Sequence, residues 1–286
     1  MNPHEPLILT ERMKFHAGLL AFVITVKDGS PSIADGSNRL SVKLAEAIMT
    51  QIGESNNHER IAAQTSGDTF EIACTNFLTA TFGSLRHIRP GSWAIQRVSR
   101  NSDGISGFDQ YAHLRDLATL CEKDRSLATS IGMDYLICPD IVVLRNPESD
   151  EFINQDNLIV DDQCSKLTPI RRANTHLPIL HASISCKFTL RSDRAQNARS
   201  EALNLIKNRK GQTPRIVVVT AEPLPSRLAS LAMGTGEIDC IYHFALQELK
   251  NAVADKGNED SQELLRIMID GKRLRDIADL PLDLVT

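Results

Sequence analysis

Residues 181–201 read HASISCKFTLRSDRAQNARSE, and the character of the chain changes within this stretch. The first part is strand-like and ends near Lys187, so we predict a strand over 177–188. Two arginines then bracket an aspartate in RSDR, 191–194, and a helix-forming segment that carries Glu201 follows. A lysine, a charged cluster and a carboxylate therefore occupy one strand-to-helix connection.

The segment after this strand has the signals of a helix followed by a second strand. Ser192 or Asp193 is suited to cap a helix that runs to about Lys210, and Gly211 is suited to close it. The next run, RIVVVTAEP at 215–223, is apolar enough for a central strand. Alternation of strands with helices predicts an α/β domain with a mostly buried sheet.

The rest of the chain extends this pattern without an evident linker, so we predict one domain over 1–286. A long polar, acidic insertion occupies about 146–178, and loops of this length inside a domain are usually functional. Further expected elements are a helix over 66–82, a helix or helix pair over 111–131, a buried strand or hairpin over 134–145, a helix over roughly 244–255, and a helix surface at KRLRD, 272–276.

Composition limits the class of protein. The chain has 286 residues and is 42% hydrophobic, which allows a substantial core. It contains no apolar run long enough to span a membrane, and its beginning does not resemble a signal peptide. The six cysteines form no CxxC pair, which argues against a cysteine zinc site and favours a reducing, cytoplasmic compartment.

Charge is unevenly distributed along the chain. Residues 187–215 hold eight Lys and Arg against two Asp and Glu, a balance of +6, whereas the whole chain is −4 and the remainder is therefore −10. A basic region within an acidic protein is typical of a confined surface for a polyanion. The alternative is a solvated basic helix face.

The residues around Lys187 have the types that phosphodiester cleavage requires. Carboxylates hold a divalent metal, and a cation offsets the charge of the transition state. Asp140 lies at an expected strand kink, and the strand position two before Lys187, where many metal-dependent nucleases have an acid, is Ser185. Glu201 could replace that acid. It lies seven residues and thus two helical turns after Arg194, so Arg194 could reach a base edge while Glu201 points back to the metal. Alternatively, Lys187 reaches solvent and Glu201 is a helix-surface residue.

Two neighbours could be mistaken for catalytic groups. His181 has no evident paired nucleophile, so we interpret it as a structural histidine. Cys186 is interpreted as a core-facing strand cysteine.

Taken together, these motifs resemble the type IIF restriction endonucleases, a branch of the PD…K nuclease superfamily. The resemblance rests on CPDIVV (138–143), SISCK (183–187), RSDR (191–194) and Glu201, and further on ADGSN (34–38), QTSGDTFE (64–71), IVVVTAEP (216–223), GTGEIDC (234–240) and KRLRDIADLPLDL (272–284). It covers most of the chain and implies a central mixed β-sheet flanked by α-helices.

The resemblance also implies roles for particular residues. Mg²⁺ would be bound by Asp140, Glu201 and the main-chain carbonyl of Cys186. Lys187 would orient or activate the attacking water, Ser185 would support the site, and Glu71 would be an auxiliary acid. Five side chains would recognise the DNA sequence. Arg191, Asp193 and Arg194 would contact a CCGG core, and Gln64 and Arg227 would contact the outer G·C pairs.

For activity and assembly, the resemblance implies cleavage of double-stranded DNA at GCCGGC after the first G, with a four-base 5′ overhang. It implies a homodimer and a homotetramer in which the 146–178 insertion helps form the contact, together with a companion methyltransferase. Two other hypotheses remain open: a catalytically silent DNA-binding protein of the same fold, and a small-molecule α/β enzyme that uses Asp140 and Lys187.

Overall fold

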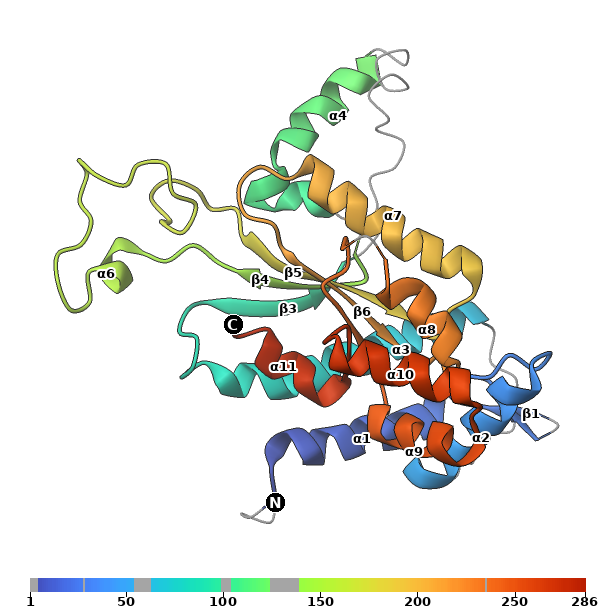
Figure 1. Ribbon diagram of the computed structural model, residues 1–286. Coiled ribbons are helices and arrows are strands. Elements are labelled where there is room, and N and C mark those ends of the chain that lie inside the picture. Colours follow the sequence, from blue (N-terminus) through green and yellow to red (C-terminus); the bar gives the residue numbers. More distant parts are fainter. Residues whose placement is uncertain (1–4, 28, 54–62, 99–103, 124–138, 235) are drawn as a thin grey trace.

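The computed structural model describes residues 5–27, 29–53, 63–98, 104–123, 139–234 and 236–286, except for the side chains at 63–65, 121–123 and 192 (Figure 1). The helices are α1 (Leu7–Phe22), α2 (Arg39–Ile52), α3 (Ala63–Phe82), α4 (His113–Lys123), α6 (Asp150–Ile153), α7 (Ser192–Asn208), α8 (Pro225–Ala232), α9 (Leu246–Lys256), α10 (Glu259–Asp270) and α11 (Leu280–Asp283). The strands are β1 (Val26–Lys27), β2 (Ser30–Pro31), β3 (Trp93–Arg97), β4 (Ile141–Arg145), β5 (Ile179–Lys187), β6 (Arg215–Thr220), β7 (Cys240–His243) and β8 (Leu274–Asp276).

The central sheet of the described chain has six strands in the order β3-β4-β5-β6-β7-β8. The pairs β3–β4 and β4–β5 are antiparallel, and the remaining neighbours are parallel. Parallel neighbours need crossover connections, and α7 and α8 provide the first two of these. The expected mixed sheet flanked by helices is therefore confirmed, and β5 stands where the antiparallel and parallel halves meet.

Helices cover both faces of the sheet. In Figure 1, α7 lies on one side of the strands, and α1 and α3 lie on the other. The expected apolar stripe of the 66–82 helix is buried in α3, with Phe70 and Leu78 fully enclosed. Phe70 also meets Phe188 just beyond β5, with ring centroids 5.5 Å apart. The α3 side of β5 is therefore part of the main hydrophobic core.

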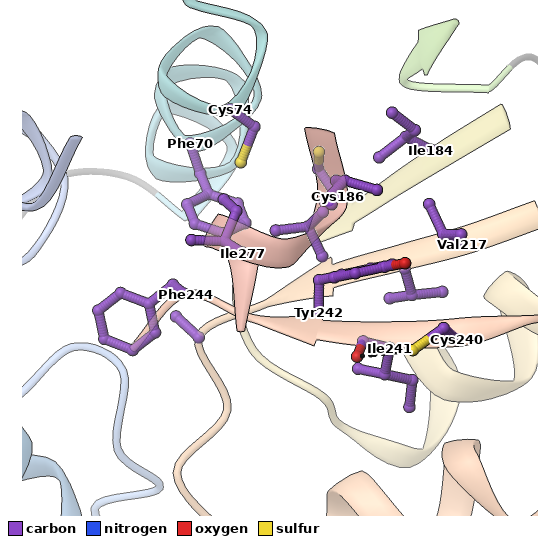
Figure 2. Close-up of a cluster of buried hydrophobic side chains, with 14 of the residues drawn as sticks. Phe70, Cys74, Ile184, Cys186, Val217, Cys240, Ile241, Tyr242, Phe244 and Ile277 are labelled. Atoms are coloured by element: carbon purple, nitrogen blue, oxygen red, sulfur yellow. Dashed lines mark hydrogen bonds between the residues drawn. The ribbon is translucent and has the colours of Figure 1, made fainter. Parts of the chain in front are cut away.

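Alternation along β5 separates its two faces. Figure 2 shows Ile184 and Cys186 in the same buried cluster as Phe70 and Cys74 of α3. Successive side chains of a strand point to opposite faces, so Ser185 points to the face that α7 covers. The interpretation of Cys186 as a core-facing cysteine is thus confirmed. Ser185 lies on the opposite face of β5 and is available for a polar site.

Several expected elements differ in their bounds. The strand within 134–145 begins only at Ile141, and the expected part over 134–138 lies outside the described residues, as does 124–131 of the second expected helix. The cap of α7 is Arg191, which makes no side-chain capping bond, so the prediction of Ser192 or Asp193 as the cap is wrong. KRLRD is not a helix surface, because Leu274–Asp276 forms the edge strand β8.

The 146–178 insertion is largely irregular and extends away from the sheet (Figure 1). Its regular structure is the single turn α6 and a bridge between Glu148 and Arg171. Arg171 is buried and holds the loop together, because its guanidinium binds the Asp150 carboxylate at 2.6 Å and the carbonyl of Cys164 at 2.8 Å. Within the described part of the chain, no helix has the length and apolar character needed to cross a bilayer.

Candidate active site

The end of β5, the approach to β4 and the middle of α7 meet at one point. Pairing of Ile141 with Ile184 brings Asp140, just before β4, beside Ser185 and Lys187 at the end of β5. Helix α7 returns over this face of the sheet and presents Glu201 from its third turn. Residues that are distant in the sequence therefore meet because two neighbouring strands and one crossover helix are packed together.

The contacts among these four residues are direct. The Lys187 ammonium lies 3.2 Å from Asp140 Oδ2 and 3.4 Å from Glu201 Oε1. The Ser185 hydroxyl donates to Glu201 Oε2 at 2.8 Å and lies 3.5 Å from Asp140 Oδ2. The peptide N–H of Cys186 donates to the same Asp140 oxygen at 2.7 Å. Two carboxylates thus converge on one ammonium and one hydroxyl, with the Cys186 peptide beside them.

Burial and charge act in opposite directions on the ionisable groups. Burial raises the pKa of Glu201 above its usual range, and nearby Asp140 adds to this, although Lys187 opposes it. Burial alone would lower the pKa of Lys187, but the two carboxylates outweigh it and raise that pKa. Lys187 therefore remains a cation at neutral pH, and it compensates the close approach of two carboxylates.

A third carboxylate lies near this group on α3. Glu71 Oε2 pairs with Arg97 Nη2 at 2.8 Å, and Arg97 ends β3 opposite Ile141. Burial raises the pKa of Glu71, the Arg97 bond opposes this, and the charge of Asp140 adds to it. Glu71 is therefore held by Arg97 at the border of the site and does not bind Lys187 or Ser185.

The donor set fits a hard divalent cation with few protein ligands. Mg²⁺ is commonly bound through one or two carboxylates and completes its shell with water and phosphate oxygens. Asp140 and Glu201 are half-buried oxygen donors that already share two hydrogen-bonding partners. No cage of three or more His, Cys, Asp and Glu side chains occurs in the described part of the chain. The site therefore suits a cation that would also bind substrate oxygens.

The RSDR segment lies at the start of α7, before the turn that carries Glu201. Arg191 and Asp193 are exposed, and Arg194 is partly buried with its Nη1 donating to Thr189 Oγ1 at 2.9 Å. The helix thus carries exposed charged side chains at its beginning and Glu201 further along. The three residues expected to read the CCGG core and the expected metal ligand Glu201 thus lie at the start and along the length of one helix.

Arg227 lies beside this segment, on α8. Its Nη2 pairs with Asp35, and its Nη1 lies 3.5 Å from Glu222 Oε2. Arg227 and Arg191 line the same open groove of about 620 Å³. Gln64 belongs to the first turn of α3, but its side chain lies outside the described residues.

Comparisons with known proteins show the family of the chain. A family model described as NgoMIV restriction enzyme matches residues 15–286. The curated type II restriction enzyme NgoMIV of Neisseria gonorrhoeae is 50% identical over 282 residues, which cover 98% of this chain and 99% of that protein. The chain belongs to the NgoMIV restriction enzyme family.

Members of the NgoMIV family are type II restriction enzymes, so this chain is a site-specific deoxyribonuclease that binds double-stranded DNA. Enzymes of this class generally use a divalent metal, in agreement with the oxygen donors of Asp140 and Glu201. The resemblance inferred from the sequence motifs is thereby confirmed. The expectation that His181 is structural also agrees with the structure, because its Nε2 binds the carbonyl of Leu284 at 2.7 Å.

Three residues at the site were not singled out by their sequence context. Arg97 holds Glu71, Asp35 holds Arg227, and Glu222 is a fully buried carboxylate next to the recognition segment. ADGSN and IVVVTAEP were recognised as family motifs, and these contain Asp35 and Glu222, but the motifs alone do not reveal their partners. For Arg97 the sequence contains no comparable signal.

Proposed function

We propose that this enzyme cuts double-stranded DNA at GCCGGC, after the first G, in a Mg²⁺-dependent reaction that leaves four-base 5′ overhangs. The convergence of Asp140 and Glu201 on Lys187 and Ser185 carries the catalytic part of this proposal. The motif-by-motif resemblance and the 50% identity to NgoMIV support the sequence preference.

In this proposal Asp140, Glu201 and the main-chain carbonyl of Cys186 hold the metal. Bound Mg²⁺ supplies Lewis acidity and neutralises charge on the cleaved phosphate. Lys187, kept protonated by the two carboxylates, orients or activates the attacking water and offsets the negative charge that develops on the phosphate. Ser185 fixes the rotamer of Glu201 through its 2.8 Å hydrogen bond, and Glu71 serves as an auxiliary acid.

The exposed charged residues at the start of α7 suit a major groove. Arg191 and Arg194 would each offer two donors to guanine O6 and N7, and Asp193 would accept from cytosine N4 in the CCGG core. Gln64 and Arg227 would contact the outer G·C pairs. Asp35 and Glu222 hold the Arg227 guanidinium from two sides, which would keep it oriented before DNA arrives.

The palindromic site suits a homodimer, and we propose a homotetramer of two such dimers in the cytoplasm. One hydrophobic cluster extends through all layers of the described chain, which supports a single endonuclease domain over 1–286. The insertion over about 146–178 exposes Leu158 and Leu167 to 82% and 96%, and such side chains are suited to a contact between dimers.

The decisive experiment is digestion of a plasmid with two GCCGGC sites, with Mg²⁺ or with EDTA, by the wild type and by Lys187→Ala. We expect Mg²⁺-dependent linear fragments whose ends map to GCCGGC. The Lys187→Ala variant should show no cutting but a retained mobility shift on the same DNA, because the recognition residues are intact.

Other outcomes separate the parts of the proposal. Normal cutting by Lys187→Ala would refute its catalytic role. A wild type that shifts the DNA and never cuts it under any metal would be a silent binder. Cutting at a different sequence would preserve the chemistry and refute the assignment of GCCGGC.

A further inference from the structure

Glu222 is a charged residue in the interior that the proposed chemistry does not use. It follows β6 in the TAEP segment, and its side chain is fully buried. Burial of a carboxylate is costly unless hydrogen bonds or a counter-charge compensate it. Its partners therefore indicate what the residue is for.

The Glu222 carboxylate binds the backbone of two segments that meet DNA in the proposed function. Its Oε2 accepts the N–H of Leu190 at 2.9 Å, and its Oε1 accepts the N–H of Leu224 at 3.1 Å. Leu190 directly precedes RSDR, and Leu224 is the residue that caps α8. One side chain thus fixes the entrance to α7 and the entrance to α8.

The same carboxylate also reaches a side chain of α8. Arg227 Nη1 lies 3.5 Å from Glu222 Oε2, while its Nη2 pairs with Asp35. Arg191 and Arg227 open onto one groove, and Leu190 also lines that groove. Burial raises the pKa of Glu222, and the two backbone bonds and Arg227 oppose this and favour the ionised form.

The surroundings of Glu222 make this arrangement rigid. Its own N–H is held by Thr220 Oγ1 at 3.2 Å, and its carbonyl lies 3.2 Å from the Nε2 of buried His243. The N–H of Ala221 further binds the carbonyl of Phe188 at 3.2 Å, so β6 and the β5–α7 connection are joined twice. Because this carboxylate is itself held in place, it can hold the segments bound to it in fixed positions.

We propose that Glu222 is a positioning residue for sequence recognition, which holds the CCGG-reading segment and Arg227 at a fixed spacing from one another. This inference rests on the proposed function, because it takes RSDR as the reader of the core and Arg227 as a reader of the outer pair. Glu222 itself contacts no base in the proposal. It holds RSDR and Arg227 together as one recognition surface, so that the CCGG core and the outer base pairs are recognised together.

The test replaces Glu222 with glutamine, which keeps the shape but puts an NH₂ opposite one of the two backbone N–H groups and removes the charge beside Arg227. Cleavage would be measured on GCCGGC and on ACCGGT, which differs only in the outer pairs. We expect the preference for GCCGGC to fall at least tenfold and KM on GCCGGC to rise about tenfold. The single-turnover rate at saturating DNA should stay within about threefold of the wild type, because the metal-binding residues are untouched.

Glu248→Gln is the matched control, because Glu248 also pairs with an arginine, Arg12, but lies on α9 away from both reading segments. It should lower the melting temperature without changing the preference between the two sites. If Glu222→Gln behaves as Glu248→Gln does, with lost stability and an unchanged preference, Glu222 is only structural and the inference is wrong.

A second variant covers the case in which Glu222→Gln does not fold. The double variant Glu222→Gln with Arg227→Gln leaves no unpaired charge in the interior, and its reference is Arg227→Gln alone. We expect the double variant to discriminate within the CCGG core at least fivefold less well than the reference, because glutamine can accept only one of the two N–H groups and no longer holds Leu190 and Leu224 together. Equal discrimination would overturn the inference.

Wild-type preference is measured first, so that the two proposals fail in different ways. A wild type that does not prefer GCCGGC over ACCGGT would refute the proposed recognition site. The sequence that it does cut would then be mapped, and the variant comparison repeated on that sequence and its outer-pair change would still confirm or refute the role of Glu222.

Discussion

Ser185 occupies a strand position that faces the carboxylates of Asp140 and Glu201 but is itself neutral. Its hydroxyl donates to Glu201 at 2.8 Å and lies 3.5 Å from Asp140, so it links the two acids without adding a third charge. A third carboxylate here would have raised the repulsion within a half-buried group that contains a single lysine. The acid therefore comes from α7, and the strand supplies a donor that fixes it.

Replacing Ser185 with alanine should slow cleavage without abolishing it. Loss of a hydrogen bond to a charged group costs about 1.5–3 kcal/mol, and a share of this lost in the transition state lowers the rate by roughly ten- to a hundredfold. The measurement is the single-turnover cleavage rate at saturating Mg²⁺ and DNA. Ser183→Ala is the control, because Ser183 is also buried on the same face of β5, two residues earlier.

The Ser183→Ala rate should match the wild type. If both serine variants cut at the wild-type rate, the hydroxyl of Ser185 does not position Glu201 in the working enzyme.

Individual residues were predictable where a local period placed them. The two-residue period of β5 placed Ser185 beside Lys187, and the helical period of α7 placed Glu201 on a usable face. Glu222 was not predictable, because its partners Leu190 and Arg227 are set by how β6 and α8 pack against α7. Such contacts across elements have no periodic signature in the sequence.

At the scale of elements, the insertion at 146–178 was predictable in extent but not in structure. Its polar and proline-containing sequence indicated a long loop, whereas nothing in it indicated that one arginine anchors it. Arg171 is 2% exposed, and its guanidinium joins two segments of the loop, through Asp150 and the carbonyl of Cys164. The insertion is therefore an ordered structure in which one buried arginine side chain is a central anchor.

Arg171→Ala should loosen the insertion while leaving the sheet intact. Limited proteolysis should cut within 155–168 at least tenfold faster than in the wild type, because the loop then lacks its anchor. If the insertion forms the contact between dimers, the same variant should have the mass of a dimer by light scattering where the wild type has that of a tetramer. Arg172→Ala is the control, since the Arg172 side chain donates to the carbonyl of Pro147 at 3.3 Å, and its backbone N–H bond to Glu148 is kept in the variant.

Equal proteolysis of Arg171→Ala and the wild type would show that the loop does not depend on this arginine. A dimeric wild type would instead refute the proposed tetramer and leave the anchoring role to be judged by proteolysis.

The C-terminal strand shows why short elements escaped prediction. The sequence KRLRD predicts a helix surface, because a charged run with one leucine carries little periodicity. In the structure Leu274 is buried and pairs with Ile241, so β8 exists because β7 offers a free edge. A three-residue strand of this kind is determined by its neighbour, and only the arrangement of the sheet reveals it.

At the scale of the whole molecule, the order of the sheet places the chemistry. β5 pairs antiparallel with β4 and parallel with β6, so the approach to β4, the end of β5 and the crossover helix α7 reach the same point. The α/β class and its buried strands followed from the pattern of apolar runs. The mixed sheet was implied by the family resemblance, because pairing direction and strand order depend on connections that the runs do not encode.

The whole fold should also lose stability in acid through its buried histidines, and His181 offers the cleanest test. Burial lowers the pKa of His181 to about 4, which is below its ordinary value of about 6.5, so the folded protein binds fewer protons at this site than the unfolded chain. Its contribution to stability is therefore complete above pH 6.5 and is lost as the pH falls toward 4. Buried carboxyl groups with raised pKa values, such as Glu201, act in the opposite direction, so a single-site comparison is required.

We expect the stability advantage of the wild type over His181→Gln to shrink by about 2 kcal/mol between pH 7.5 and pH 5. The free energy of unfolding would be measured in urea by circular dichroism at both pH values. Glutamine can still donate to the carbonyl of Leu284, so the variant changes mainly the titration. An advantage that stays constant between the two pH values would mean that the pKa of His181 is the same in the folded and the unfolded state, so that its 2.7 Å bond to Leu284 offsets burial.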